Sequence, residues 1–268
     1  MRGDIKRGDQ FIVTIKPGRN CERRHAAGRR LILIMNKVTI GIIVATELEL
    51  ENIEKAITEK SYVELSGMKF ITGVLSGKKI VAARCGVGKV FAAICTQTMI
   101  LGFSPDVIVN VGVAGGLSGA LEIGEIFIAE HAVQHDMNTM ALGDELGLIS
   151  GINMVYLPTD EKVTSVLESA VQKVGVNYEV GTIATGDAFI NTNEMRNFLV
   201  ETFSAAACDM ESAAVVQTCY VNNVPCSIMR AISDSGDDNS HMDYQDFAKK
   251  AADTSAEVVA EFVKQWNN

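Results

Sequence analysis

Apolar and polar positions along most of the chain follow a strand pattern and then a helix pattern in turn. Residues 38–45 (VTIGIIVA) form a continuous apolar run of strand length, and the next segment, 46–57, places Leu48, Ile53 and Ile57 near one helical face. A buried strand followed by an amphipathic helix is typical of α/β proteins. We therefore expect the fold to begin with a strand-to-helix unit near residue 38.

The rest of the chain repeats this alternation with one interruption. Between residues 58 and 84, short β-rich segments are punctuated by glycines, which predicts a meander rather than another crossover. Further strands are expected at 106–117, 125–133, 180–190 and 225–236, and further helices at 88–103, 159–174, 193–203, 210–221 and 243–266. The pattern predicts an α/β fold, a three-layer αβα sandwich with a mixed, mostly parallel central sheet.

Residues 1–34 do not share this pattern. They carry nine Lys and Arg against three Asp and Glu and show neither helical nor strand periodicity. The acids count against a transit peptide, and Asn36 and Lys37 interrupt any apolar core of a signal peptide. We expect this extension to be non-native and to lie outside the fold, translation to begin at Met35, and residues 35–268 to form a single domain.

Charge and cysteine content exclude several classes of function. The net charge is −9, and after residue 34 the chain carries 15 basic against 30 acidic residues, which argues against nucleic acid as a partner. Six cysteines without a CxxC pair favour reduced thiols and a cytoplasmic location. No apolar stretch reaches the roughly 18 residues that span a bilayer. His131 and His135 lack the acid of an HExxH site, so neither metal nor cofactor is expected.

Small and polar residues collect directly after four of the predicted strands. They lie at Ala45–Glu49, Val113–Gly116, Thr185–Ile190 and Ser233–Asp234. In α/β sheets, ligands bind outside the carboxyl ends of the strands, so this arrangement predicts a pocket there. The glycines of GVAGG lack the GxGxxG spacing and the lysine of a P-loop, which argues against a nucleotide-phosphate site.

Three carboxylates in these segments could be catalytic, and each also has a structural interpretation. Glu49 follows Thr46 by three residues, which is the spacing of a capping box. Asp234 precedes a Gly-containing loop, where Asp commonly forms a turn. Glu211 begins a helix, where a carboxylate is favoured by the helix dipole. Arg230 lies within a predicted buried strand and needs a carboxylate partner, which Glu211 could supply.

Six segments together are more specific than any of these residues alone. They read GIIVATELEL, CGVGKV, NVGVAGGL, TGDAFIN, DMESAA, and RAISDSGD followed by SHMDYQDF. In this order they resemble the 5'-methylthioadenosine/S-adenosylhomocysteine nucleosidases, from about Met35 to the C-terminus. The resemblance implies hydrolysis of the N-glycosidic bond of these adenine nucleosides, with water as the second reactant, in methionine salvage and the recycling of S-adenosylmethionine by-products.

The resemblance also implies a role for each matching residue. Asp234 matches the acid that protonates N7 of adenine, with Ser233 beside it, and Glu49 matches the residue that activates water. Glu211 matches the carboxylate that holds the ribose hydroxyls, with Arg230 orienting it. The remaining matches contact the sugar or the base: Ala114, Gly115, Met210, Phe189 stacking on adenine, and Ile190 through its backbone.

These roles require the two catalytic carboxyls to be in opposite protonation states. Adenine anion is a poor leaving group, so a proton on N7 lets the base depart neutral while C1' acquires oxocarbenium character. Asp234 must then carry a proton near neutral pH, and Glu49 must be ionised.

The chain departs from the family pattern at three places that border the substrate. Thr46 stands where Met is frequent, Val113 where Ser is common, and Leu142 where an aromatic residue is frequent. The family is usually a homodimer in which the neighbour's loop near Leu142 lines the pocket. These departures leave the preference for the 5' substituent open.

Three alternatives compete with this interpretation. A purine nucleoside phosphorylase needs anion donors facing C1', yet the first strand ends in ATELE, whose carboxylates repel phosphate, and Arg84 is the only candidate donor. An aminodeoxyfutalosine nucleosidase would share all three carboxylates. A non-catalytic nucleoside-binding or storage protein on the same fold would be expected to lack at least one of them, and none is missing.

Overall fold

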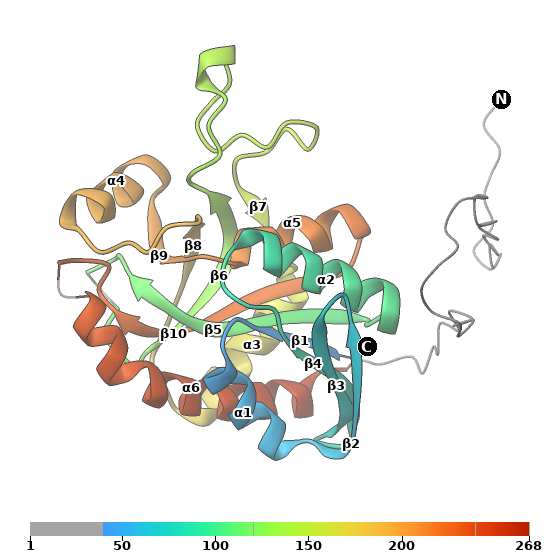
Figure 1. Ribbon diagram of the computed structural model, residues 1–268. Helices are drawn as coiled ribbons and strands as arrows, with labels where there is room; N and C mark the ends of the chain where they lie inside the picture. The colour runs from blue at the N-terminus through green and yellow to red at the C-terminus, as the bar shows by residue number, and fades with distance from the viewer. Residues whose placement is uncertain (1–39, 120, 239, 268) are drawn as a thin grey trace, which may run out of the picture. The chain divides into compact units, whose positions relative to one another are not determined.

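The computed structural model describes residues 40–119, 121–238 and 240–267 (Figure 1). The strands are β1 (Ile40–Val44), β2 (Thr58–Leu65), β3 (Met68–Leu75), β4 (Lys78–Arg84), β5 (Val107–Gly116), β6 (Ile126–Gln134), β7 (Leu157–Pro158), β8 (Tyr178–Thr185), β9 (Ala205–Asp209) and β10 (Cys226–Asp234). The helices are α1 (Glu47–Ala56), α2 (Lys89–Phe103), α3 (Glu161–Val174), α4 (Asn193–Phe203), α5 (Ser212–Asn222) and α6 (Ser240–Gln265), with a 3₁₀ turn at Met140–Leu142. The predicted extension 1–34 and the predicted start at Met35 lie outside the described residues.

The strands form one mixed sheet in the order β10-β6-β8-β9-β5-β1-β4-β3-β2. The predicted α/β class, the mixed sheet and the meander of β2, β3 and β4 are confirmed. The prediction of a mostly parallel sheet is not confirmed for the described strands, because five of their ten pairings are parallel and five are antiparallel. One reason is that no helix separates β5 from β6, so β6 returns antiparallel to β10.

The sheet closes on itself at one end. β10 pairs with β6 on one side and with β5 on the other, so the path from β10 through β6, β8 and β9 to β5 is a ring. The closure depends on the end of β5, where Gly115 pairs with Asp234 of β10 and with Cys208 of β9. Five strand ends therefore surround one small region.

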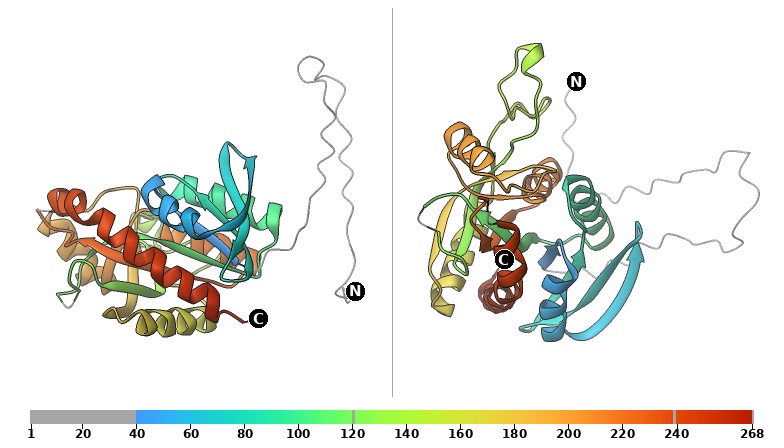
Figure 2. Two further views of the ribbon diagram at one scale, coloured as in Figure 1. Left: turned by 90° about the horizontal axis from the view of Figure 1, so that it is seen from below. Right: turned by 60° about the vertical axis from the view of Figure 1, so that its left-hand side comes forward.

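Helices cover both faces of the sheet. In Figure 1, α1 and α6 lie below the sheet, while α2 and α5 lie above it. Figure 2 shows α6 running beside α3 and α1, and the three helices pack against one apolar cluster of the sheet. A second cluster lies between the sheet and the α2–α5 pair. None of the helices within the described ranges has the length and apolar composition to cross a membrane.

Candidate functional site

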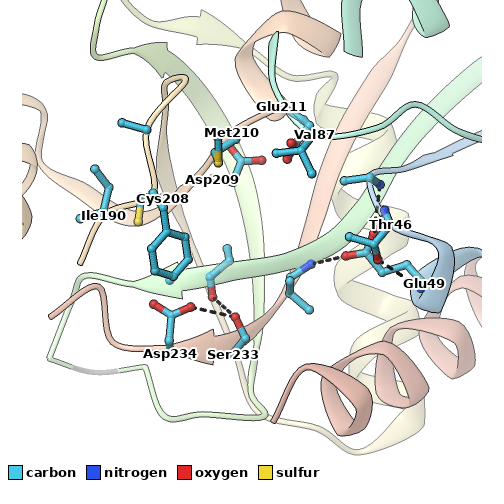
Figure 3. A pocket seen from close by; sticks show the side chains of 16 residues that line it. Thr46, Glu49, Val87, Ile190, Cys208, Asp209, Met210, Glu211, Ser233 and Asp234 are labelled. Atoms are coloured by element: carbon cyan, nitrogen blue, oxygen red, sulfur yellow. Dashed lines mark hydrogen bonds between the residues drawn. The ribbon is translucent and has the colours of Figure 1, made fainter. Parts of the chain in front are cut away.

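A cavity of about 370 Å³ opens where β1, β5, β8, β9 and β10 end (Figure 3). The structure brings together at this cavity nine of the ten residues predicted to form the site. The lining residues are Ala45, Thr46, Glu49, Val87, Val113, Ala114, Gly115, Ala188, Phe189, Ile190, Cys208, Asp209, Met210, Glu211, Ser233 and Asp234. Arg230 is not among them.

Glu49 lies at the β1 end of the cavity, and three backbone amides hold its carboxylate. Oε2 accepts hydrogen bonds from the amides of Ala45 and Thr46 at 3.0 and 2.8 Å, and Oε1 accepts one from Val113 at 3.1 Å. The Thr46 hydroxyl accepts in turn from the Glu49 amide, which completes a capping box at the start of α1. Glu49 is only 4% exposed. The same carboxylate therefore both caps the helix and faces the cavity.

Asp234 lies at the opposite end of the cavity, as the last residue of β10. Its Oδ2 accepts a hydrogen bond from the Ser233 hydroxyl at 2.9 Å, and its Oδ1 accepts one from the Gly236 amide at 3.0 Å. The register of β10 against β5 shifts between Ile232 and Asp234, which marks a β-bulge. Such bulges re-aim a side chain beside an active site. Figure 3 shows Asp234 and Glu49 at separate ends of the cavity.

Two glycines of β5 make room for these carboxylates. A Cβ added at Gly112 would lie 2.8 Å from Oε1 of Glu49, and one added at Gly115 would lie 2.9 Å from Oδ1 of Asp234. Cβ atoms do not approach other atoms that closely without a shift. The glycines that the sequence placed after a strand therefore allow both carboxylates to lie against the backbone of β5.

Glu211 forms the wall between the two ends. It precedes α5, but its side chain makes no capping bond; its Oε1 accepts a hydrogen bond from the Gly88 amide at 2.8 Å. Burial and the nearby charge of Asp209 raise its pKa to about 7, although the Gly88 amide and Arg230 act in the opposite direction. Glu211 is thus at the start of α5, where the helix dipole favours a carboxylate as predicted, while the side chain that accepts from the first turn is that of Asp209, which binds the Ser212 amide at 3.0 Å.

Arg230 has a different partner from the one predicted. Its guanidinium donates to Oδ2 of Asp209 from Nε at 3.2 Å and from Nη2 at 2.7 Å, and also to the Asn110 side chain and the Ser212 hydroxyl. Arg230 is 2% exposed and lies behind the cavity wall. The prediction that it pairs with Glu211 and lines the site is wrong, because Asp209 is the carboxylate at the end of β9 that faces β10. Arg230 acts on the site through Asp209.

The loop after β8 carries Phe189 and Ile190 over the cavity. Phe189 is 42% exposed, whereas Ile190 is 4% exposed. An acid–base cluster anchors the start of this loop: Asp187 accepts from the Lys89 amide at 2.8 Å, its own amide donates to Asp136 at 3.0 Å, and Asp136 contacts the Lys89 ammonium at 2.5 Å.

The positive charge of Lys89 offsets the burial of the Asp136 carboxylate in this cluster. Burial alone would raise the pKa of Asp136, but the Lys89 ammonium and the Asp187 amide lower it below its usual value. Because Gly88 binds Glu211 and the adjacent Lys89 binds Asp187, consecutive amides at the start of α2 hold two walls of the cavity.

Three lining residues were missed by the analysis of the sequence. Glu211 was predicted to be the functional carboxylate of the DMESAA segment, and Asp209, two positions earlier, was not considered. Only the place of Asp209 at the end of a buried strand could have indicated that it lines the cavity. Val87 and Cys208 are apolar positions that carry no chemical signal. Thr46 and Val113, where the chain departs from the family pattern, both line the cavity. Leu142 does not; it is 83% exposed.

The cavity is suited to a neutral or positively charged ligand. Four carboxylates line it, namely Glu49, Asp209, Glu211 and Asp234, and none of its lining residues, all in the described part of the chain, is Lys, Arg or His. Arg84, the only predicted anion donor, forms an ion pair with Glu47 at 3.1 Å outside this cavity. An ionised group at one end and a second carboxyl at the other can perform acid and base chemistry on a ligand between them.

Comparison with known proteins agrees with this fold. The family model of the phosphorylase superfamily matches residues 39–264, and this superfamily is the class of protein that the fold and the cavity define. A 5'-methylthioadenosine/S-adenosylhomocysteine nucleosidase of Staphylococcus carnosus (strain TM300) is 38% identical over 226 residues, which make up 84% of this chain and 99% of the relative. The chain belongs to the 5'-methylthioadenosine/S-adenosylhomocysteine nucleosidase family.

Solved structures show the same relationship. The nucleosidase of this family from Neisseria meningitidis, in complex with methylthio-immucillin-A, has a TM-score of 0.83 and 33% identity and covers 85% of this chain and 99% of that chain. The futalosine hydrolase of Helicobacter pylori strain 26695 has a TM-score of 0.82 and 33% identity and covers 85% of this chain and 98% of that chain.

Proposed function

We propose that this chain is an N-glycosyl hydrolase that releases adenine from 5'-methylthioadenosine and S-adenosylhomocysteine. The observation that carries the proposal is the cavity with four carboxylates and no basic side chain among its lining residues. A phosphorolytic site must bind a phosphate dianion next to C1', but no basic side chain lines this cavity to hold the dianion, and an ionised Glu49 beside the sugar repels it. Water is neutral and needs only a base. Hydrolysis therefore fits this cavity, and phosphorolysis does not.

The mechanism divides the work between the two ends of the cavity. Adenine lies against Phe189, and Asp234 gives a proton to N7, so the base leaves as a neutral molecule. Glu49 accepts a proton from the water that attacks C1'. Glu211 accepts hydrogen bonds from the ribose hydroxyls, and Met210 packs beside the sugar. Asp209 and Arg230 hold the strand end from which Glu211 projects.

Base release in six parallel reactions tests this function. The purified chain is incubated with 5'-methylthioadenosine, S-adenosylhomocysteine or inosine, with and without phosphate, and the free base is quantified. Adenine should appear from the first two nucleosides at the same rate in both buffers, and inosine should remain intact. Adenine release that requires phosphate would identify a phosphorylase instead.

A second candidate substrate is favoured by one comparison. The Helicobacter pylori structure with 33% identity is named a futalosine hydrolase, and an aminodeoxyfutalosine nucleosidase would use the same carboxylates. Aminodeoxyfutalosine is therefore added as a fourth nucleoside in the same assay. A kcat/KM for it above that for 5'-methylthioadenosine would make it the preferred substrate.

We also propose that the chain works as a homodimer whose second copy covers the cavity mouth. The exposed face of α2 supports this proposal, because Val90, Phe91 and Leu101 on it are 69%, 53% and 62% exposed. Val87 links this face to the cavity, and Leu142 presents a further exposed apolar side chain. Sedimentation should give a dimer for the chain and a monomer for Val90→Asp.

The cellular setting follows from the same proposal. Release of adenine from these two nucleosides belongs to methionine salvage and to the recycling of S-adenosylmethionine by-products. The five cysteines in the described residues are free and buried, which favours a reducing, cytoplasmic compartment. The family match beginning at residue 39 supports a single domain over 35–268, with residues 1–34 outside it.

A further inference from the structure

A second cavity lies beside the first along the same edge of the sheet. Its volume is about 610 Å³, and its walls include Glu47, Arg84, Gly86 and Met68. Strand β4 runs parallel to β1, so its carboxyl end, at Arg84, lies at the same edge as the end of β1. Strand β3 runs antiparallel to β4, which brings its first residue, Met68, to this edge as well.

Two segments of the chain divide the two cavities. Thr46 lines the first cavity and the adjacent Glu47 lines the second. Likewise Val87 lines the first cavity and the adjacent Gly86 lines the second. The two cavities therefore adjoin at these segments, and a ligand that extends beyond Thr46 and Val87 comes next to Glu47 and Gly86.

The proposed function determines which part of a substrate points that way, and this inference rests on it. Adenine lies at the end formed by Asp234 and Phe189, and the sugar lies between Glu49 and Glu211. Thr46 and Val87 line the first cavity on the side away from Asp234 (Figure 3). The 5' substituent is the part of the nucleoside that leaves the cavity at this end.

An ion pair lines the second cavity. The Nε of Arg84 lies 3.1 Å from an Oε atom of Glu47, and the two side chains are 52% and 57% exposed. Exposed ion pairs of this kind contribute little to stability, so a ligand can separate them. A guanidinium carries five N–H donors and binds carboxylates through two of them at once.

We propose that this second cavity binds the amino-acid end of S-adenosylhomocysteine. That end is a zwitterion with one carboxylate and one ammonium group, and the cavity offers a matching cation and anion. Arg84 binds the carboxylate and Glu47 binds the ammonium, so the ligand exchanges one internal ion pair for two external ones. 5'-Methylthioadenosine has only an uncharged methyl group in this place, which offers nothing for either member of the pair to bind. Arg84 and Glu47 therefore determine specificity between the two substrates.

Steady-state kinetics on both substrates tests this subsite. Arg84→Ala should lower kcat/KM for S-adenosylhomocysteine about tenfold, the loss expected for one charged hydrogen-bonded contact, while kcat/KM for 5'-methylthioadenosine changes less than about twofold. Glu47→Gln should act in the same direction. The matched control is Lys79→Ala, which removes one positive charge at the opposite, exposed end of β4.

An analogue of S-adenosylhomocysteine that lacks the carboxylate tests whether Arg84 binds that group. S-adenosylhomocysteine with its carboxylate converted to an amide should be hydrolysed equally by the wild-type chain and by Arg84→Ala. Equal loss on both substrates, or no loss on either, would overturn the subsite. A wild-type chain that hydrolyses neither nucleoside would instead overturn the proposed function.

Discussion

The carboxyl groups at the two ends of the cavity both lie against β5, but their hydrogen-bond partners differ. Glu49 and Asp234 each lie against a glycine of β5, Gly112 and Gly115. Three backbone amides hold Glu49, and an amide can only donate, so this environment fits a carboxylate without a proton. Asp234 accepts from one amide, that of Gly236, and its other oxygen contacts the Ser233 hydroxyl, which can donate or accept, so this oxygen fits either protonation state. This difference supports the proposed roles of Glu49 as the base and Asp234 as the acid.

The largest effect is expected from removing the proton donor. Asp234→Asn should lower kcat roughly 100- to 10,000-fold, because an amide cannot protonate N7, while adenine still binds. Measuring kcat on 5'-methylthioadenosine and the Kd of adenine by calorimetry separates the two effects. A variant that keeps more than a tenth of the wild-type kcat would show that Asp234 is not the acid.

Glu49→Gln should lower kcat by roughly 100-fold or more and should also affect stability, since Glu49 completes the capping box of α1. The amide side chain keeps an oxygen but loses the charge, so we expect a loss of about 1 kcal/mol in the free energy of unfolding. Urea unfolding measures this loss. Glu51→Gln, on an exposed position of the same helix, is the control and should change neither quantity.

Most of the fold could be predicted from the sequence because its apolar runs have clear periods. Strand β9 (Ala205–Asp209) could not, since its alanine-rich residues directly follow α4 and carry no strand preference. It becomes a strand because β8 and β5 lie on either side of it. The closed ring of strands requires β9, so the ring could not be predicted from local sequence patterns either.

The sequence could predict which strand ends meet at the site, but not which side chains contact each other there. Four segments were expected to meet, and all four line the cavity. The partner of Arg230 was not predictable, because Asp209 and Glu211 are only two positions apart in the sequence. Which of them contacts Arg230 depends on where β9 ends, and β9 ends at Asp209. The role of the glycines also depends on distances between side chains and backbone, which a linear pattern does not contain.

The glycines test whether each carboxylate needs its place on β5. Gly112→Ala and Gly115→Ala should each lower kcat about tenfold or more, with an overpacking penalty of about 1–3 kcal/mol in the free energy of unfolding. Only Gly115→Ala should also weaken adenine binding, because its methyl group meets Asp234 and Cys208 at the base end. Gly119→Ala, where a Cβ meets nothing within 4 Å, is the control. Identical behaviour of the two variants would contradict the division of the cavity into two ends.

The pH dependence of kcat/KM should follow the protonation of Glu211, which lies between the two ends of the cavity. Because burial raises the pKa of Glu211 to about 7, kcat/KM should fall about tenfold per pH unit below that value, as the protonated carboxyl loses an acceptor for the ribose hydroxyls. A raised pKa also means that Glu211 favours the folded chain most below its ordinary value of 4.5 and loses this contribution as pH rises to about 7. A kcat/KM profile that stays flat from pH 5 to 7 would contradict this assignment, and Glu211→Gln should remove the stability slope.

The smallest effect is expected from the anchor of the base loop. Asp136→Asn keeps one acceptor for the Asp187 amide but weakens the contact with the Lys89 ammonium, so the loop that carries Phe189 becomes less well positioned. We expect KM for 5'-methylthioadenosine to rise about threefold to tenfold, equivalent to about 0.7–1.4 kcal/mol of binding free energy, with kcat nearly unchanged. Glu145→Gln, an exposed acid in the following segment, is the matched control. A fall in kcat without a change in KM would show that the anchor acts on the chemistry at Asp234 rather than on the position of the base, and the two ends of the cavity would then be coupled through this loop.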